Sequence, residues 1–247
     1  FTAYPTATWG ALLKYKITKE VLSKTGIYNG DDRVGDNKYH GTDFSMRSNK
    51  GVLLLQEFSY LLNQSEDSKG LPGNYKLGGM YDSGKFDDFY KDENGNSAAI
   101  SGLPKRKHRG TYGFYLHGDQ MVYREGGPDS KQGLTLFSVL TFAPADVNEF
   151  SFFVDGGLVY TGLVPKRDTD VTALGFAYGQ WSKDLANYQN DSGQSPQKYE
   201  VMMELNYKIM LTPYFYLQPD LQYIFNPGGT GNIDDALVVG TRVGVIF

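Results

Sequence analysis

The chain of 247 residues is long enough for one large domain or two small ones, and its formal net charge of −4 argues against a nucleic-acid-binding protein. It contains no cysteine, so disulfides, zinc–thiolate sites and cysteine nucleophiles are excluded from this chain. Aromatic residues make up 15% of the sequence and glycine contributes 30 residues. This composition favours β-structure, because aromatic side chains pack well on pleated surfaces and glycine serves turns and bulges.

Apolar and polar residues alternate in segments that recur along the whole chain, separated by turn-forming residues. A period of two predicts strands, and no segment has a persuasive helical period. In chain order the eleven predicted strands lie at roughly 7–17, 21–29, 51–62, 73–82, 111–124, 133–143, 149–163, 171–182, 198–211, 215–226 and 236–247. The connections 83–110 and 184–197 are predicted to be long polar loops. No linker divides the chain, so we expect one domain over residues 1–247.

The segment 199–211 shows the alternation most clearly. Its odd positions, from Tyr199 to Leu211, are all apolar or aromatic, whereas its even positions include Glu200, Glu204 and Lys208. The predicted strands run to about ten residues or more, the length that crosses a bilayer at a tilt. Strands of soluble sandwiches are usually about five or six residues long. The lengths therefore favour a membrane-spanning barrel.

Hydropathy fits the same interpretation. No run of about 18 apolar residues predicts a transmembrane helix. The mean hydropathy of −0.42 suits a soluble protein, but it also suits a transmembrane barrel, in which only every second strand residue faces lipid. Aromatic residues gather near the predicted strand ends, as expected for girdles at two membrane interfaces. The predicted fold is an all-β, transmembrane antiparallel β-barrel.

The sequence ends at Phe247, on the apolar face of the last predicted strand. Such an edge would favour aggregation in a soluble protein, whereas a closed barrel has no edge. A terminal aromatic residue in this setting resembles the assembly signal of bacterial outer-membrane barrels, which implies recognition by the barrel-assembly machinery. No signal peptide is visible at the start of the chain, and we expect it to have been removed or to lie upstream.

Four long segments resemble OprB-type carbohydrate-selective porins: LPGNYKLGGMYDSG (71–84), GFYLHGDQMVYREGG (113–127), DGGLVYTGLVPKRDTDV (155–171), and the stretch from ELNYKIMLTPYFYLQPDLQYIFNPGG to ALVVGTRVGVIF (204–247). The resemblance implies a sixteen-stranded barrel in the bacterial outer membrane that lets small sugars such as glucose diffuse passively. It implies no catalytic residue, cofactor or metal. Because single-chain bacterial barrels have even strand numbers, we interpret the chain as the C-terminal portion of a porin, without about five N-terminal strands. The turn at 212–213 is then periplasmic, and the loop NPGGTGNIDD lies outside.

The polar face of each predicted strand is expected to line a water-filled lumen, where side chains replace part of a solute's hydration. The predicted lumen wall carries both positive and negative side chains, and such a mixed wall suits neutral polar solutes better than ions. The alternative for any one residue is that it only solvates the wall and pairs across strands. The candidates are Lys14, Lys16, Glu57, Lys76, Asp82, His117, Asp119, Asp155, Glu200, Glu204, Asn206, Lys208, Gln218, Asp220, Gln222 and Arg242.

The sequence gives weaker evidence for functions other than a sugar channel. The three histidines show no metal-ligand spacing. Asp119 and Glu125 could form a carboxylate pair for glycoside hydrolysis, although paired acids on strands are common without catalysis. The basic run 104–109 is expected to meet lipopolysaccharide phosphates or water in an outer loop.

Besides the sugar channel, two alternatives stay open: an outer-membrane barrel for surface binding, adhesion or catalysis, and a soluble carbohydrate-binding sandwich. The expected partners are outer-membrane lipid, lipopolysaccharide and sugars, with no nucleic acid, in a monomer or a homotrimer.

Overall fold

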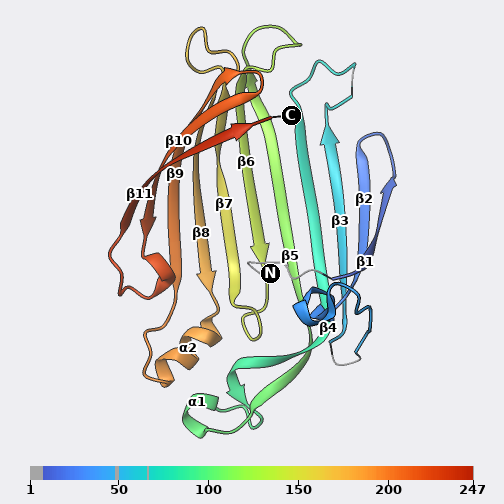
Figure 1. Ribbon diagram of the computed structural model, residues 1–247, viewed down its shortest axis with the longest axis vertical. Helices are drawn as coiled ribbons and strands as arrows, with labels where there is room; N and C mark the ends of the chain where they lie inside the picture. The colour runs from blue at the N-terminus through green and yellow to red at the C-terminus, as the bar shows by residue number, and fades with distance from the viewer. Residues whose placement is uncertain (1–7, 48–49, 66, 247) are drawn as a thin grey trace.

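The computed structural model describes residues 8–47, 50–65 and 67–246. In these ranges eleven strands form one antiparallel sheet, and every strand pairs with its neighbours in the sequence. Figure 1 shows the strands side by side in a long, curled sheet, with β10 and β11 passing in front of their neighbours. The strands are β1 (Gly10–Lys16), β2 (Val21–Asn29), β3 (Val52–Leu62), β4 (Gly73–Asp92), β5 (Lys105–Arg124), β6 (Gly133–Phe142), β7 (Phe150–Thr161), β8 (Val171–Trp181), β9 (Tyr199–Thr212), β10 (Phe215–Phe225) and β11 (Ala236–Val245).

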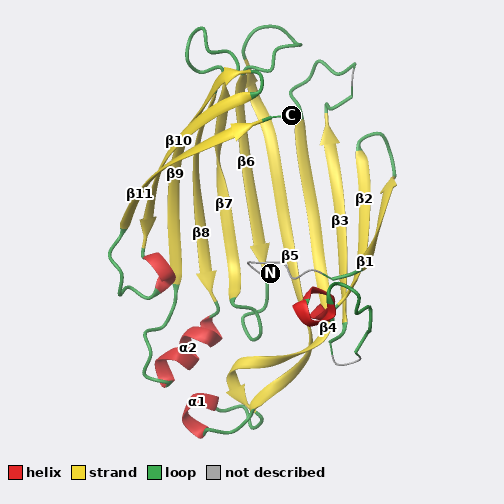
Figure 2. Cartoon of the chain, viewed as in Figure 1, coloured by secondary structure: helices red, strands yellow, loops and turns green. Residues whose placement is uncertain are grey.

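Helical elements are short and gather at one end of the sheet (Figure 2). They are η1 (Asp32–Gly35), η2 (Asn37–Tyr39), α1 (Ala98–Ser101), α2 (Lys183–Asp191) and η3 (Pro227–Gly229). Not one helix in the described ranges has the length and apolarity needed to cross a bilayer. At the opposite end most connections are shorter, and β9 is joined to β10 by residues 213–214 alone.

The alternation predicted all eleven strands, and the antiparallel all-β prediction is confirmed. The connection 83–110 was predicted wrongly as a loop. There β4 continues to Asp92, β5 begins at Lys105, and α1 lies at the tip of the hairpin. Register shifts between Asp82 and Lys85, and again before Asp92, interrupt the two-residue period. Because of these bulges and its mostly polar residues, this part of the strand has no two-residue period that could be recognised in the sequence.

The connection 184–197 was also predicted wrongly, because it contains α2. Ser182 caps this helix, and its Oγ accepts hydrogen bonds from the backbone N–H groups of Asp184 (3.1 Å) and Leu185 (3.0 Å). No residue of the helix is buried. The helix is short, and Leu185, Ala186 and Tyr188 are its only apolar or aromatic residues, which is too few to show a helical period in the sequence.

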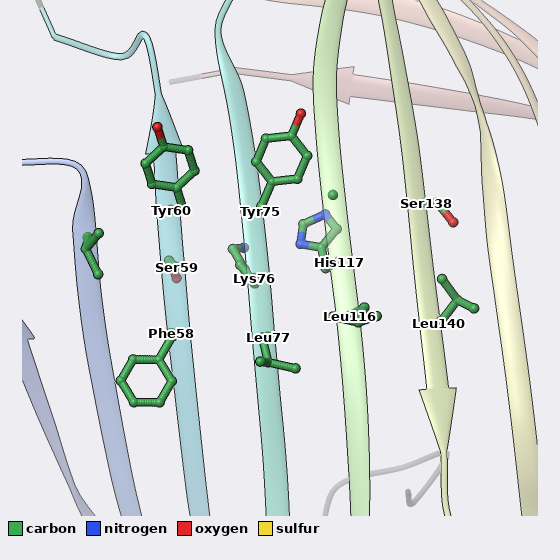
Figure 3. A pocket seen from close by; sticks show the side chains of 12 residues that line it. Phe58, Ser59, Tyr60, Tyr75, Lys76, Leu77, Leu116, His117, Ser138 and Leu140 are labelled. Atoms are coloured by element: carbon green, nitrogen blue, oxygen red, sulfur yellow. The ribbon is translucent and has the colours of Figure 1, made fainter.

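The two faces of the sheet differ in chemistry. Large apolar side chains such as Leu77, Phe114 and Leu205 stand on the convex face, each about half exposed. Figure 3 looks onto this face, where Phe58, Tyr60 and Tyr75 help to line a groove of about 430 Å³. In a sandwich a second sheet would bury one face, but in the described part of the chain there is a single sheet. The only buried apolar residues in that part of the chain are Ala98, Met121, Ala143 and Trp181. The sandwich alternative is therefore wrong.

Candidate functional site

The register places all sixteen candidate residues on one face of the sheet. Directly paired residues project from the same face, so a face can be followed from strand to strand. Lys76 pairs with His117, His117 with Val139, and Val139 with Asp155. The other candidates lie on the same side by their pairings or by two-residue steps along a strand. This is the concave face, opposite the aromatic residues of Figure 3.

Glu57 is the centre of a hydrogen-bonded group that we call the Glu57 cluster. Its carboxylate lies 2.8 Å from Nζ of Lys24, and it accepts hydrogen bonds from the hydroxyls of Tyr115 (2.5 Å) and Ser59 (3.0 Å). Tyr115 reaches Glu57 from β5, across β4, where Gly78 leaves room. A Cβ at that glycine would lie 2.2 Å from the tyrosine ring. The carboxylate is therefore held by β2, β3 and β5 together.

Glu204 is the centre of a second group, the Glu204 cluster. Its two carboxylate oxygens accept hydrogen bonds from the side-chain amides of Asn206 (2.7 Å) and Gln222 (3.0 Å). Asn206 in turn pairs with Asp220 in the register of β9 and β10. The structure thus brings together four of the candidate residues. Their acceptors and donors face the concave side of the sheet.

Other candidate residues have different surroundings. Glu200 accepts a hydrogen bond from the backbone N–H of Gly228 (2.6 Å), so it ties β9 to the η3 turn. Asp82 accepts one from the backbone N–H of Gly84 (2.8 Å), at the bulge of β4. Asp119 accepts one from the Asn74 amide at 3.2 Å. Lys14 and Lys16 lie on the exposed edge strand β1 and form no group with the two clusters.

Three residues of the Glu57 cluster on the concave face were not predicted from the sequence. Lys24 and Ser59 lie in segments with poor alternation, and Tyr115 is aromatic, so it was not counted among the polar positions. The ladder pairing Lys24 with Glu57 identifies the first of them. Such pairings depend on the register of the sheet, which one sequence does not contain.

The pair proposed for glycoside hydrolysis is not assembled. Asp119 lies on the concave face, whereas Glu125 follows the end of β5 and accepts a hydrogen bond from the hydroxyl of Tyr160 at 3.2 Å. Tyr160 belongs to the convex face by its pairing with Leu134. Glu125 is therefore bonded to the convex side of the sheet, whereas Asp119 lies on the concave side. The basic run 104–109 is mostly strand, where Lys107 pairs with Asp87 and His108 with Asp88.

A curled antiparallel sheet with an aromatic convex face and a polar concave face is the arrangement of bacterial outer-membrane barrels. The whole chain, residues 1–247, matches the family described as "Carbohydrate-selective porin, OprB family". The chain belongs to this family of outer-membrane porins.

Individual relatives agree with the family. Porin B of Pseudomonas aeruginosa is 29% identical over 259 residues, and the match covers 99% of this chain and 56% of that protein. The putative porin QuiX of Acinetobacter baylyi is 24% identical over 265 residues, with the same coverage of 99% and 56%. The high-pH structure of Pseudomonas putida OprB superposes with a TM-score of 0.87 at 29% identity, covering 98% of this chain and 59% of that one. The chain thus spans somewhat more than half the length of these relatives.

Proposed function

We propose that this chain forms the C-terminal part of a β-barrel through which small sugars such as glucose diffuse passively across the outer membrane. The observation that carries the proposal is the polar concave face, on which the Glu57 and Glu204 clusters present acceptors and donors to one side of the sheet. A sugar entering a pore loses part of its hydration, and such groups replace it. The carboxylates hold fixed positions because each is bonded to neighbouring strands.

The mixed character of the wall suits neutral solutes. Carboxylates, amides, hydroxyls and cations are interspersed on this face of the described strands, so the face as a whole carries both signs of charge. Several weak contacts in succession let a solute enter and leave, whereas one tight site would trap it. In this proposal the sixteen candidate residues line the lumen, and Gln218, Asp220 and Gln222 face water while Leu217, Leu221 and Tyr223 face lipid. No enzymatic step is needed.

The edges β1 and β11 indicate how the barrel is completed. We propose that residues 1–247 belong to one porin domain of sixteen strands, with the others supplied by the rest of the protein. The end that carries α1 and α2 faces outward, because bacterial barrels have short periplasmic turns and longer outer loops. Lipopolysaccharide then lies near the β4–β5 extension, in a monomer or a homotrimer. The proposed assembly signal, Phe247, lies outside the described residues.

Liposome swelling tests the proposal directly. The purified porin, taken from outer membranes, is reconstituted and exposed to glucose, to an amino acid and to a dicarboxylate of similar size. We expect the fastest swelling with glucose. Equal rates for all three solutes would contradict carbohydrate selectivity, and no swelling from a folded barrel would overturn the channel itself.

A further inference from the structure

Two cations and an amide form one row across β9, β10 and β11, which we call the cationic row: Lys208, Gln218 and Arg242. Gln218 pairs with Arg242 in the ladder of β10 and β11. Leu217 pairs with Ile209, so the next position of that ladder sets Lys208 opposite Gln218. Since neighbouring strands lie about 4.8 Å apart, the backbones of Lys208 and Arg242 are roughly 10 Å apart. Two long side chains span that distance easily.

Neither cation of the row is neutralised within the described part of the chain, where no carboxylate oxygen lies within 4.0 Å of Lys208 or Arg242. Lys24, on the same face, contrasts with them because its Nζ lies 2.8 Å from Glu57. Asp220 is the carboxylate two residues from Gln218, and it lies over Gly240, where a Cβ would be 2.6 Å from its Oδ1. The row therefore presents positive charge to the lumen.

Tyr216 restricts one of the two cations. Its ring lies over Gly244, where a Cβ would be 2.2 Å from the ring, so the ring occupies the space left by the absent side chain. The Nζ of Lys208 lies over this ring, 4.1 Å from its centroid. A cation held over an aromatic ring is partly ordered before any ligand arrives, which lowers the entropy lost on binding. Arg242, between Gly240 and Gly244, has no bulky neighbour on its own strand and face.

We propose that the cationic row binds the carboxylate of a sugar acid, a monosaccharide oxidised at one end; this inference rests on the proposed channel function. The planar guanidinium of Arg242 suits a carboxylate, which it can hold with two parallel hydrogen bonds. Lys208 adds a compact charge, and the Gln218 amide serves a neighbouring hydroxyl. The Glu204 cluster lies farther along the same strands and meets the remaining hydroxyls. The wall thus offers cations to one end of the solute and acceptors to the other.

Uptake of two labelled probes by proteoliposomes tests the row: gluconate, which carries the carboxylate, and glucose, which does not. The porin purified from outer membranes is compared with Arg242→Gln, with the double variant Lys208→Gln/Arg242→Gln, and with Lys131→Gln. Lys131 is exposed in the β5–β6 turn and loses the same charge far from the row. Salt is kept equal on both sides, and heat-modifiable migration on gels shows that each barrel is folded.

We expect the double variant to slow gluconate uptake by about tenfold, which corresponds to the loss of one charge-assisted hydrogen bond. Glucose uptake should fall by a clearly smaller factor, because glucose has no carboxylate for the cations to hold. Arg242→Gln should give a smaller loss, and Lys131→Gln none. Raising the salt should reduce the gluconate uptake of the unaltered porin, because partly exposed charges are screened. An equal fall for both probes, or no fall for gluconate, would overturn the cationic row as a site. Failure of the unaltered porin to pass glucose would instead overturn the channel proposal.

Discussion

Glycine on the concave face decides how closely side chains from neighbouring strands approach one another. At Gly78 there is no side chain between β3 and β5, and the Tyr115 ring uses that space to reach Glu57. Gly244 gives the Tyr216 ring the same room beside Arg242. In both places the glycine is needed because it has no Cβ, and not because its backbone has an unusual φ angle.

Gly78→Ala should therefore destabilise the sheet. The added methyl would collide with the Tyr115 ring, and overpacking of this kind costs about 1–3 kcal/mol. The measurement is the thermal unfolding midpoint in detergent. Gly127→Ala is the matched control, because no heavy atom lies within 4 Å of a Cβ there. Equal midpoints for the two variants would show that Tyr115 is not held against Gly78.

Asp170 organises the turn between β7 and β8. It is buried, and its carboxylate accepts hydrogen bonds from Arg167 Nε (2.7 Å), from the Tyr207 hydroxyl (2.6 Å) and from the Met210 backbone N–H (2.9 Å). Burial raises the pKa of this carboxyl. The hydrogen bonds from Arg167 and Tyr207 lower the pKa by more than burial raises it, so the pKa lies below its usual value. The charged carboxylate thus joins the turn to β9.

This depressed pKa predicts how stability depends on pH. A carboxyl with a lowered pKa in the folded state stabilises above its unfolded pKa, about 3.9, and that contribution is lost as the pH falls. The thermal midpoint should therefore drop below about pH 4 more steeply in the unaltered protein than in Asp170→Asn. At neutral pH that variant should lose about 1–3 kcal/mol, because buried donors lose their acceptor. Asp168→Asn, exposed in the same turn, is the control; identical pH profiles for both variants would refute the role of Asp170.

At the scale of elements, α2 is fastened to the sheet through its cap. The Ser182 hydroxyl also donates to the backbone carbonyl of Ala145, and its backbone N–H donates to Glu149. Lys105 of β5 lies over the Tyr188 ring of the helix at 4.1 Å. The helix therefore connects the β6–β7 loop with the extended hairpin of β4 and β5.

Ser182→Ala should loosen α2 without unfolding the barrel. Loss of an N-cap costs a helix about 0.5–2 kcal/mol, and here the contact to Ala145 is lost as well. Hydrogen exchange should speed up in Lys183–Asp191, with the global thermal midpoint unchanged. Ser192→Ala, at the other end of the helix, removes one bond to the Tyr188 carbonyl and serves as the control. Unchanged exchange in Ser182→Ala would show that the cap does not hold the helix.

The elements also show what a single sequence can reveal. Strands such as β9 and β10 were predicted because each face meets a different medium, and a period of two records that difference. The part of β4 beyond Asp82 and the start of β5 are mostly polar and contain two register shifts, so the two-residue period was lost. The helix α2 has no fully buried residue and too few apolar residues to show a helical period.

At the scale of the whole molecule, one curled sheet separates an apolar surface from a polar one. The sequence predicted which face each candidate residue occupies, because parity along a strand fixes it. It did not predict the Glu57 and Glu204 clusters, because they join residues of different strands whose pairing depends on the register. Lys24 and Glu57 are 33 residues apart, and only the ladder of β2 and β3 brings them together.

Thiol labelling along β10 is the most direct test of the claim that the concave face is the lumen. The chain has no cysteine of its own, so single cysteines can be placed at Gln218, Asp220 and Gln222, and in matched variants at Leu217, Leu221 and Tyr223. A charged, membrane-impermeant thiol reagent is then added to the porin in membranes. We predict rapid labelling at the first three positions and little at the other three. Equal labelling of both sets, or the reverse pattern, would contradict a polar pore on the concave side of this sheet.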